Sequence, residues 1–360
     1  MQFSKVKEAL LFHYVVLFFY ICSCSTEQFP RDNTWSVQLK TEIIDNLPYT
    51  IPVSQRTRSI FWDKEHGRIC ASLCSNRIEL YSLEKDSIIK IIPVDFINTE
   101  NCQIQARSLN MIAIASVTKI YKYIEPQWDS IDLRSTVDSI VEIRSFSSLA
   151  ITSSYDIAFA FAAVANLKSA KEGYYDGVAI WKNNRDINVL KYDQPSIYRT
   201  HDFLIGNYQI TNKNDSIIVT CSMDDDIHIF YNDMHYKWRV KSPFTKFNEL
   251  PDPSNNTAED ARLAMFVYKY FESYGPVFSL SRNRVVRILY LRKEVNEPNK
   301  NKVLIQVVSG NGIVSYYTIP ASIYTYHPGW SCNGNELIYL ERKNDTNENC
   351  QYIVHTISFP

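Results

Sequence analysis

Two stretches of the sequence carry nearly the same run of hydrogen-bonding and aromatic residue types. Residues 196–201 read Ser-Ile-Tyr-Arg-Thr-His, and residues 322–327 read Ser-Ile-Tyr-Thr-Tyr-His. Such side chains combine aromatic surface for stacking with hydrogen-bond donors, which is the chemistry of a binding rim. The rim would consist of Tyr198, Arg199, His201, Tyr324, His327 and Trp330. The alternative is that both stretches descend from one linker that is kept for packing.

A run of three aspartates, Asp224–Asp226, precedes His228 and could offer oxygen ligands to calcium or magnesium. Consecutive residues of a strand point to opposite faces, however, so three adjacent carboxylates do not converge on one ion. We therefore predict a polar turn between two strands and no metal site. The same interpretation applies to the next turn, which would hold Asn232, Asp233 and His235.

Four arginines, Arg282, Arg284, Arg287 and Arg292, lie in a stretch with strand-like composition. Strand periodicity places Arg287 on one face and the other three on the opposite face. This predicts a solvated outer strand, with a polyanion-binding face as the alternative.

Other kinds of chemistry lack their motifs. The chain has 9 glycines among 360 residues and contains no G-x-G-x-x-G, P-loop or G-x-S-x-G sequence, so neither a phosphate-binding loop nor a serine nucleophile is indicated. No C-x-x-C pair suggests zinc. The 38 basic residues nearly balance 39 acidic ones, which argues against nucleic-acid binding. We expect no cofactor and identify no catalytic residue.

The first residues have the pattern of an export signal. Lys5 and Lys7 precede an apolar stretch at 9–22, which is shorter than the roughly 20 residues that span a bilayer. The following Ile21-Cys22-Ser23-Cys24 is similar to a bacterial lipobox, so residues 1–23 would be removed and Cys24 would carry lipid. Several acyl chains on one residue anchor a protein stably. An ordinary cleaved signal is the alternative.

Export permits disulfides among the six remaining cysteines. Cys332 and Cys350 bracket a short hairpin-like segment and form the best candidate pair. Buried thiols are the preferred interpretation for most of the six, which also include Cys70, Cys74, Cys102 and Cys221.

The elements that would position these residues are short strands in a repeating unit. A strand rich in β-branched residues and ending in an aromatic residue recurs at 77–81, 119–123, 177–181, 226–230 and 312–317. A repeat of about 40 to 60 residues with four strands is typical of a propeller blade. The expected blades are 59–94, 104–133, 148–192, 203–240, 274–319 and 324–359.

The prediction is thus an all-β, six-bladed β-propeller with one short helical insertion at 260–273. Residues 24–45 would form a lipidated tether whose segment 35–44 pairs with the last blade, and 46–360 a single propeller domain. The aligned stretches 196–201 and 322–327 would then lie at one mouth of the central channel. A β-sandwich pair or a ring of five or seven blades is the alternative.

In this layout the chain resembles uncharacterised lipoproteins of gut Bacteroidetes that carry a TolB-like six-bladed propeller. The resemblance rests on the lipobox at Cys24, the degenerate blades, and Tyr274-Gly275-Pro276-Val277-Phe278 followed by the Arg-rich strand 282–292. It implies a cell-envelope protein without an established activity. It also implies O-glycan acceptors in Asp-Ser-Ile steps, at Ser87, Ser130, Ser139 and Ser216. A hairpin turn feeding an outer strand explains the same steps.

Together these features favour a non-catalytic lipoprotein, anchored to the outer membrane and periplasmic or surface-exposed, that binds a protein, peptide or glycan. The alternative is an envelope hydrolase or lyase that acts on carbohydrate or peptide at the channel mouth.

Overall fold

The computed structural model describes residues 34–36, 38–44, 58–97, 102–133, 140–143, 149–164, 174–183, 186–190, 208–222, 224–232, 234–240, 273–281, 283–291, 302–310, 312, 314–319, 329–334, 336–342 and 352–359. The chain divides into two units, Met1–Trp35 and Ser36–Pro360. Strand β1 (Thr34–Ser36) lies across their boundary. Within the described residues, no helix is long and apolar enough to cross a membrane.

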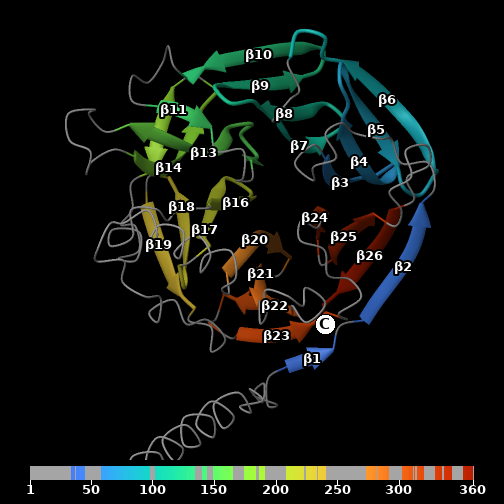
Figure 1. Ribbon diagram of the computed structural model, residues 1–360, viewed down its shortest axis with the longest axis vertical. Helices are drawn as coiled ribbons and strands as arrows, with labels where there is room; N and C mark the ends of the chain where they lie inside the picture. The colour runs from blue at the N-terminus through green and yellow to red at the C-terminus, as the bar shows by residue number, and fades with distance from the viewer. Residues whose placement is uncertain are drawn as a thin grey trace, which may run out of the picture. The chain divides into compact units, whose positions relative to one another are not determined.

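The second unit consists of antiparallel sheets that follow one another along the chain (Figure 1). The first blade has strands β3 (Arg58–Asp63), β4 (Gly67–Leu73), β5 (Arg77–Ser82) and β6 (Ser87–Pro93). The second has β7 (Gln103–Ser108), β8 (Met111–Ala115), β9 (Lys119–Ile124) and β10 (Gln127–Asp132). The third has β11 (Ile140–Ile143), β12 (Ala150–Ile151), β13 (Ile157–Val164), β14 (Tyr174–Trp181) and β15 (Ile187–Leu190).

The remaining blades follow the same plan. The fourth has β16 (Tyr208–Lys213), β17 (Ser216–Cys221), β18 (Asp226–Tyr231) and β19 (Met234–Arg239). The fifth has β20 (Ser273–Leu280), β21 (Arg284–Leu291), β22 (Lys302–Ser309) and β23 (Val314–Thr318). The sixth has β24 (Gly329–Asn333), β25 (Glu336–Arg342) and β26 (Tyr352–Ser358), and its outer strand is β2 (Gln38–Ile44).

The inner strands of successive blades contact one another in a closed cycle. β3 contacts β7, β7 contacts β12, β12 contacts β16, β16 contacts β20, β20 contacts β24, and β24 returns to β3. The ring is closed in sequence by β2, which pairs antiparallel with β26 from Gln38 opposite Ser358 to Ile44 opposite Tyr352. The predicted all-β, six-bladed propeller is therefore confirmed, as is the pairing of the segment before the first blade with the last. The predicted helical insertion at 260–273 lies outside the described residues except for Ser273, which begins β20.

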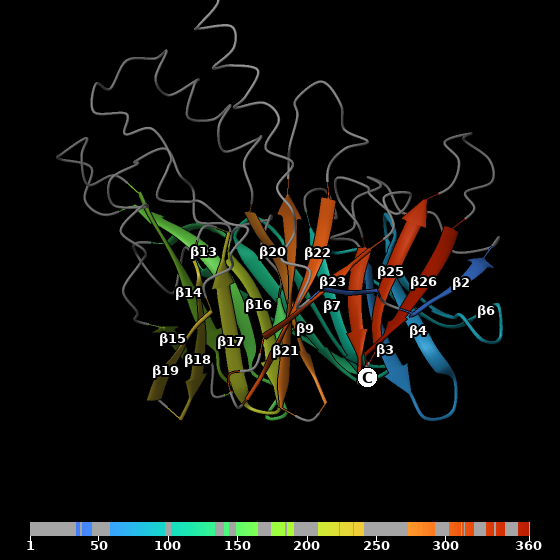
Figure 2. The ribbon, with the colours of Figure 1, turned by 90° about the horizontal axis from the view of Figure 1, so that it is seen from below.

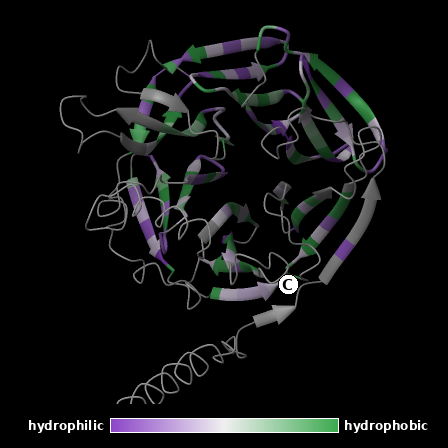
Figure 3. Cartoon of the chain, in the orientation of Figure 1, coloured by the Kyte–Doolittle hydropathy of each residue, from purple (hydrophilic) through white to green (hydrophobic). Residues whose placement is uncertain are grey.

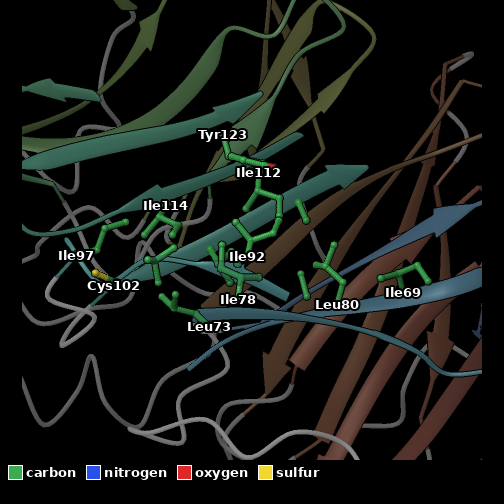
Figure 4. Packing of buried hydrophobic residues seen from close by; sticks show 14 of the residues in the cluster. Ile69, Leu73, Ile78, Leu80, Ile92, Ile97, Cys102, Ile112, Ile114 and Tyr123 are labelled. Carbon is green, nitrogen blue, oxygen red and sulfur yellow. The ribbon is translucent and has the colours of Figure 1, made fainter. Parts of the chain in front are cut away.

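The core consists of apolar clusters, each between two neighbouring blades. Figure 4 shows the cluster between the first two blades, where Ile78 and Leu80 of β5 pack with Ile112 and Ile114 of β8. The second and third strands of a blade are covered on both sides, so most of their residues are buried. In β4, for example, six of the seven residues are buried.

Two of the outer strands are instead largely exposed. β6 and β19 have exposed residues along most of their length, and purple, hydrophilic residues mark β10 and β19 in Figure 3. Viewed from the side, the strands of all blades run between the two faces of the ring (Figure 2).

Turns between first and second strands join neighbouring blades. Ser153 N donates to Asn214 O at 3.1 Å, and Ser281 N donates to Gly334 O at 3.0 Å. Lys213 Nζ donates to Asn283 Oδ1 at 2.7 Å. Asn214, Asn283 and Gly334 all have positive φ, near 55°, which asparagine and glycine tolerate best. The turn sequences thus stabilise the ring as well as the hairpins.

Candidate functional site

The predicted rim falls mostly on residues that the structure leaves undescribed. Tyr198, Arg199, His201, Tyr324 and His327 all lie outside the described residues, so the rim remains a prediction. Trp330 lies on β24, where its ring packs on the cluster between the fifth and sixth blades and 4.9 Å from the ring of Tyr339. Its Nε1 is buried and has no hydrogen-bond partner. Trp330 therefore contributes to packing between blades.

The cysteines are thiols where the structure describes them. Cys70, Cys74, Cys102 and Cys221 are buried thiols, as the sequence favoured. Cys332 is a thiol that donates to Ser279 O at 3.4 Å, and its predicted partner Cys350 lies outside the described residues, as does Cys24. Burial, with the Glu336 carboxylate, raises the pKa of the Cys332 thiol to about 12. Such a thiol is protonated and unreactive at neutral pH.

The Asp-Ser-Ile steps occupy three different settings. Ser87 is exposed and begins the outer strand β6 after Asp86, while Ser216 is partly buried and begins the second strand β17. Ser130 is exposed in the middle of β10. The interpretation of a hairpin turn that feeds an outer strand is therefore confirmed at Ser87 and wrong for residues 129–131, because the register of β9 and β10 continues through them. At Ser216 the turn feeds an interior strand. Ser139 lies outside the described residues.

A cluster of polar side chains lies on the fourth blade. Asp224 Oδ2 accepts a hydrogen bond from His228 Nε2 at 2.8 Å, and His228 Nδ1 lies 3.0 Å from His235 Nε2. His228 is 2% exposed and Asp224 is buried, whereas His235 is exposed. Because the carboxylate accepts from Nε2, a neutral His228 presents Nδ1 as an acceptor to the N–H of His235. The three side chains thus form a chain from the interior to the surface.

His235 lies on β19 and not in the preceding turn, which corrects the prediction. The register places it opposite Phe230, and its ring stacks on that phenyl ring at 4.6 Å. Alternation along β18 brings Asp226, His228 and Phe230 to one face, and this face receives the side chain of His235. The feature of the sequence that indicates the contact between these histidines is that His228 and His235 lie on either side of a two-residue turn.

A second set of charges flanks this chain on the same two strands. Asp226 forms ion pairs with Lys237 and with Arg239, whose Nε lies 3.4 Å from Asp226 Oδ1. Asp226 is buried, and its backbone N donates to Asp224 Oδ1 at 2.9 Å. The aspartate run therefore starts in a polar turn between two strands, as predicted, whereas its last residue, Asp226, begins β18. Within the described residues, no group of three or more His, Cys, Asp or Glu side chains could hold a metal ion.

Arg287 holds this turn from the neighbouring blade. Its guanidinium donates to the carbonyl oxygens of Asp224 (2.9 Å), Asp225 (3.3 Å) and Val240 (3.0 Å). Its Nε donates to Gln306 Oε1 at 2.9 Å. The side chain is 0% exposed. A buried cation is tolerated because these acceptors replace its water.

This position overturns the prediction of a solvated outer strand. β21 lies between β20 and β22, and so it is an interior strand of its sheet. Arg284 is partly buried, and Arg282 and Arg292 lie outside the described residues. The sequence feature that was missed is the run Arg-Val-Val-Arg-Ile-Leu-Tyr-Leu, which has apolar residues on both of its faces. Such a run indicates a strand covered on both sides, where an arginine must be hydrogen-bonded.

The chain matches no protein-family model, and no curated protein matches it in sequence. Among solved structures it is similar to a luciferin-regenerating enzyme, with 8% identity and a TM-score of 0.46 over 89% of this chain and 98% of that one. It is also similar to a protein of unknown function from Bacteroides caccae, with 11% identity and a TM-score of 0.39 over 72% of this chain and 81% of that one.

A third similar structure is the CNH domain of AfRom2, with 8% identity and a TM-score of 0.40 over 89% of this chain and 100% of that one. Since all these TM-scores lie below 0.5, none bears on what the chain does. The chain is a six-bladed β-propeller by virtue of its own sheets and their closed cycle of contacts.

Proposed function

We propose that this chain is a lipid-anchored protein of the cell envelope whose propeller is a non-catalytic scaffold for a protein, peptide or glycan partner. In this proposal residues 1–23 are a signal, Cys24 carries the lipid on the outer membrane, and the propeller is periplasmic or surface-exposed. The relationship to Bacteroidetes lipoproteins with TolB-like propellers is part of the same proposal.

The observation that carries the proposal is the exposed apolar surface on the outer strands. Large side chains are 39–53% exposed on β6, β15 and β19, namely Ile88, Ile91, Val189, Met234 and Tyr236. Two of these side chains, Met234 and Tyr236, contact each other on β19, and exposed apolar residues that gather on one part of a surface indicate contact with another molecule.

The hydrolase or lyase alternative has less support. It needs acidic and histidine side chains gathered at the mouth of the ring. Asp224, His228 and His235 are instead on the outer two strands of the fourth blade and on the turn before them. Each of the three is engaged in a contact within its own blade, which is the arrangement of a structural cluster.

Labelling with an alkyne fatty acid tests the anchor. The full chain is expected to incorporate the label and to sediment with membranes, whereas Cys24→Ser is expected to do neither. Ser25→Ala, which keeps the cysteine, is the matched control. A Cys24→Ser variant that retains the label would contradict the proposal.

A further inference from the structure

Strand β19 forms the outer edge of the fourth blade. The sheet runs β16-β17-β18-β19, so within the described part of the chain β19 pairs with β18 on one side only. All residues of β19 are exposed except Trp238, which is partly buried. An edge strand presents backbone N–H and C=O groups to which another strand can bond.

The register identifies the backbone groups that point outward. Val240 N donates to Asp225 O at 3.2 Å, and the next pair inward is Asp226 opposite Arg239. Bonded and non-bonded pairs alternate in an antiparallel ladder. Trp238 and Tyr236 therefore bond to β18, whereas the backbone N–H and C=O groups of Lys237 and Arg239 point toward the open edge.

The charge on this edge is positive. Lys237 and Arg239 share one carboxylate, that of Asp226, so one positive charge in this group of three is not neutralised. The lysine and arginine side chains are 43% and 77% exposed, and the exposed His235 lies two residues before Lys237 on the same face. An acidic partner would complement this surface.

The opposite face of β19 is aromatic and apolar. Met234, Tyr236 and Trp238 alternate with the basic residues, and the Tyr236 hydroxyl lies 3.1 Å from Met234 Sδ. Met234 and Tyr236 are 48% and 47% exposed. A partner strand would thus find cations on one face and apolar surface on the other.

We propose that the edge of β19 binds an extended acidic peptide segment as an added antiparallel strand. Backbone groups of Lys237 and Arg239 bond to the peptide, its carboxylates face these two side chains, and its apolar residues face Met234 and Tyr236. Strand addition combines main-chain bonds for affinity with alternate side chains for specificity. This inference rests on the proposed scaffold function and names its class of partner.

The edge of the second blade provides a control within the same chain. β10 is also an outer strand, and Leu133 N donates to Thr118 O at 3.0 Å. The same alternation directs the N–H of Ser130 outward. β10 carries Asp129 and Asp132 and no basic residue, so it does not attract an acidic peptide.

The test measures binding of a fluorescent peptide of sequence EVEYEV to the full chain by anisotropy, with KVKYKV as the charge-reversed probe. Lys237→Pro removes one outward N–H together with the lysine charge and leaves the β18 ladder bonded, because proline is tolerated at a sheet edge. Ser130→Pro makes the same backbone change on β10. Expected results are binding of EVEYEV alone, a dissociation constant raised at least about tenfold by Lys237→Pro, and no change with Ser130→Pro.

Lys237→Glu with Arg239→Glu supplies a second variant that keeps the backbone intact. This double variant is expected to raise the dissociation constant for EVEYEV to a similar degree and to bind KVKYKV instead. The proposal is overturned if wild type does not bind EVEYEV, if it binds both peptides equally, or if the charge reversal leaves affinity unchanged. These outcomes leave the Cys24 labelling result unaffected, so failure of this site is distinguishable from failure of the proposed function.

Discussion

Nδ1 of His228 lies 3.0 Å from Nε2 of His235, while Nε2 of His228 lies 2.8 Å from Oδ2 of Asp224. A buried imidazole is thereby held between a buried carboxylate and an exposed ring. The contacts join the turn before β18 to the outermost strand of the blade. The cluster therefore fixes the strand whose edge is proposed to bind a peptide.

Removing the imidazole of His228 should be costly because Oδ2 of the buried Asp224 carboxylate loses its hydrogen bond from that ring. We expect His228→Leu to lower the free energy of unfolding by about 2–4 kcal/mol. Asp224→Asn combined with His228→Leu should cost less than the sum of the two single changes, because no buried charge is left unpaired. Urea denaturation measures all three. Strict additivity would show that the two side chains are not coupled.

Arg287 should contribute far more to stability than a surface arginine. Arg287→Ala strips hydrogen bonds from the carbonyl oxygens of Asp224, Asp225 and Val240, and we expect a loss of about 3 kcal/mol. Arg239→Ala, at an exposed ion pair, should change stability by less than about 1 kcal/mol. Equal effects in urea denaturation would contradict the role of Arg287 between blades.

The arginines also show what the sequence could predict and what it could not. Strand periodicity correctly placed Arg284 and Arg287 on opposite faces, because that alternation is a local property of the backbone. Which strands flank β21 depends on pairing between distant residues, such as Arg287 opposite Gln306. The predicted outer position of this strand was therefore wrong, although the predicted alternation of its side chains was right.

The blades were predictable for a related reason. Each recurs as a hairpin unit with its own turn residues, and the ring follows from stacking these units. The chain from Asp224 to His235 was missed because it depends on the register of β18 and β19, which a two-residue turn between His228 and His235 sets. The predicted rim at 196–201 and 322–327 lies outside the described residues and stays a prediction.

Asp63 should make the first blade sensitive to acid. Its carboxylate accepts a hydrogen bond from the side chain of His66 and others from the backbone N–H groups of Glu65 and His66, which hold the pKa of Asp63 below its usual 3.8. A lowered pKa means that this stabilisation is fully present above pH 3.8 and is lost as the pH falls through the native pKa.

The check is a thermal melting profile against pH for wild type and Asp63→Asn. The wild type should melt higher at neutral pH, and the difference should shrink in acid below pH 3.8. Asp95→Asn, at an exposed aspartate near the other end of the same blade, is the control. A difference that stays constant down to the lowest pH would contradict the assignment.

The buried thiols should resist alkylation in the folded protein. Burial raises the pKa of Cys74 and of Cys102 to about 11, so both remain protonated at pH 8. Peptide mapping after iodoacetamide treatment should find these residues unmodified without urea and modified with it. A non-reduced sample in the same experiment tests the predicted Cys332–Cys350 pair, and rapid native labelling of Cys102 would contradict the buried position.

The central claim is that the propeller is an anchored binding scaffold, and photo-cross-linking in intact cells tests it most directly. Benzoylphenylalanine placed at Tyr236 of the full-length chain, next to the proposed edge, should give a discrete adduct in the membrane fraction. The same group at Trp128 on β10 should not give that adduct, and Cys24→Ser should move the protein out of the membrane fraction. Absence of any adduct at Tyr236, with the wild-type chain in the soluble fraction, would contradict the account.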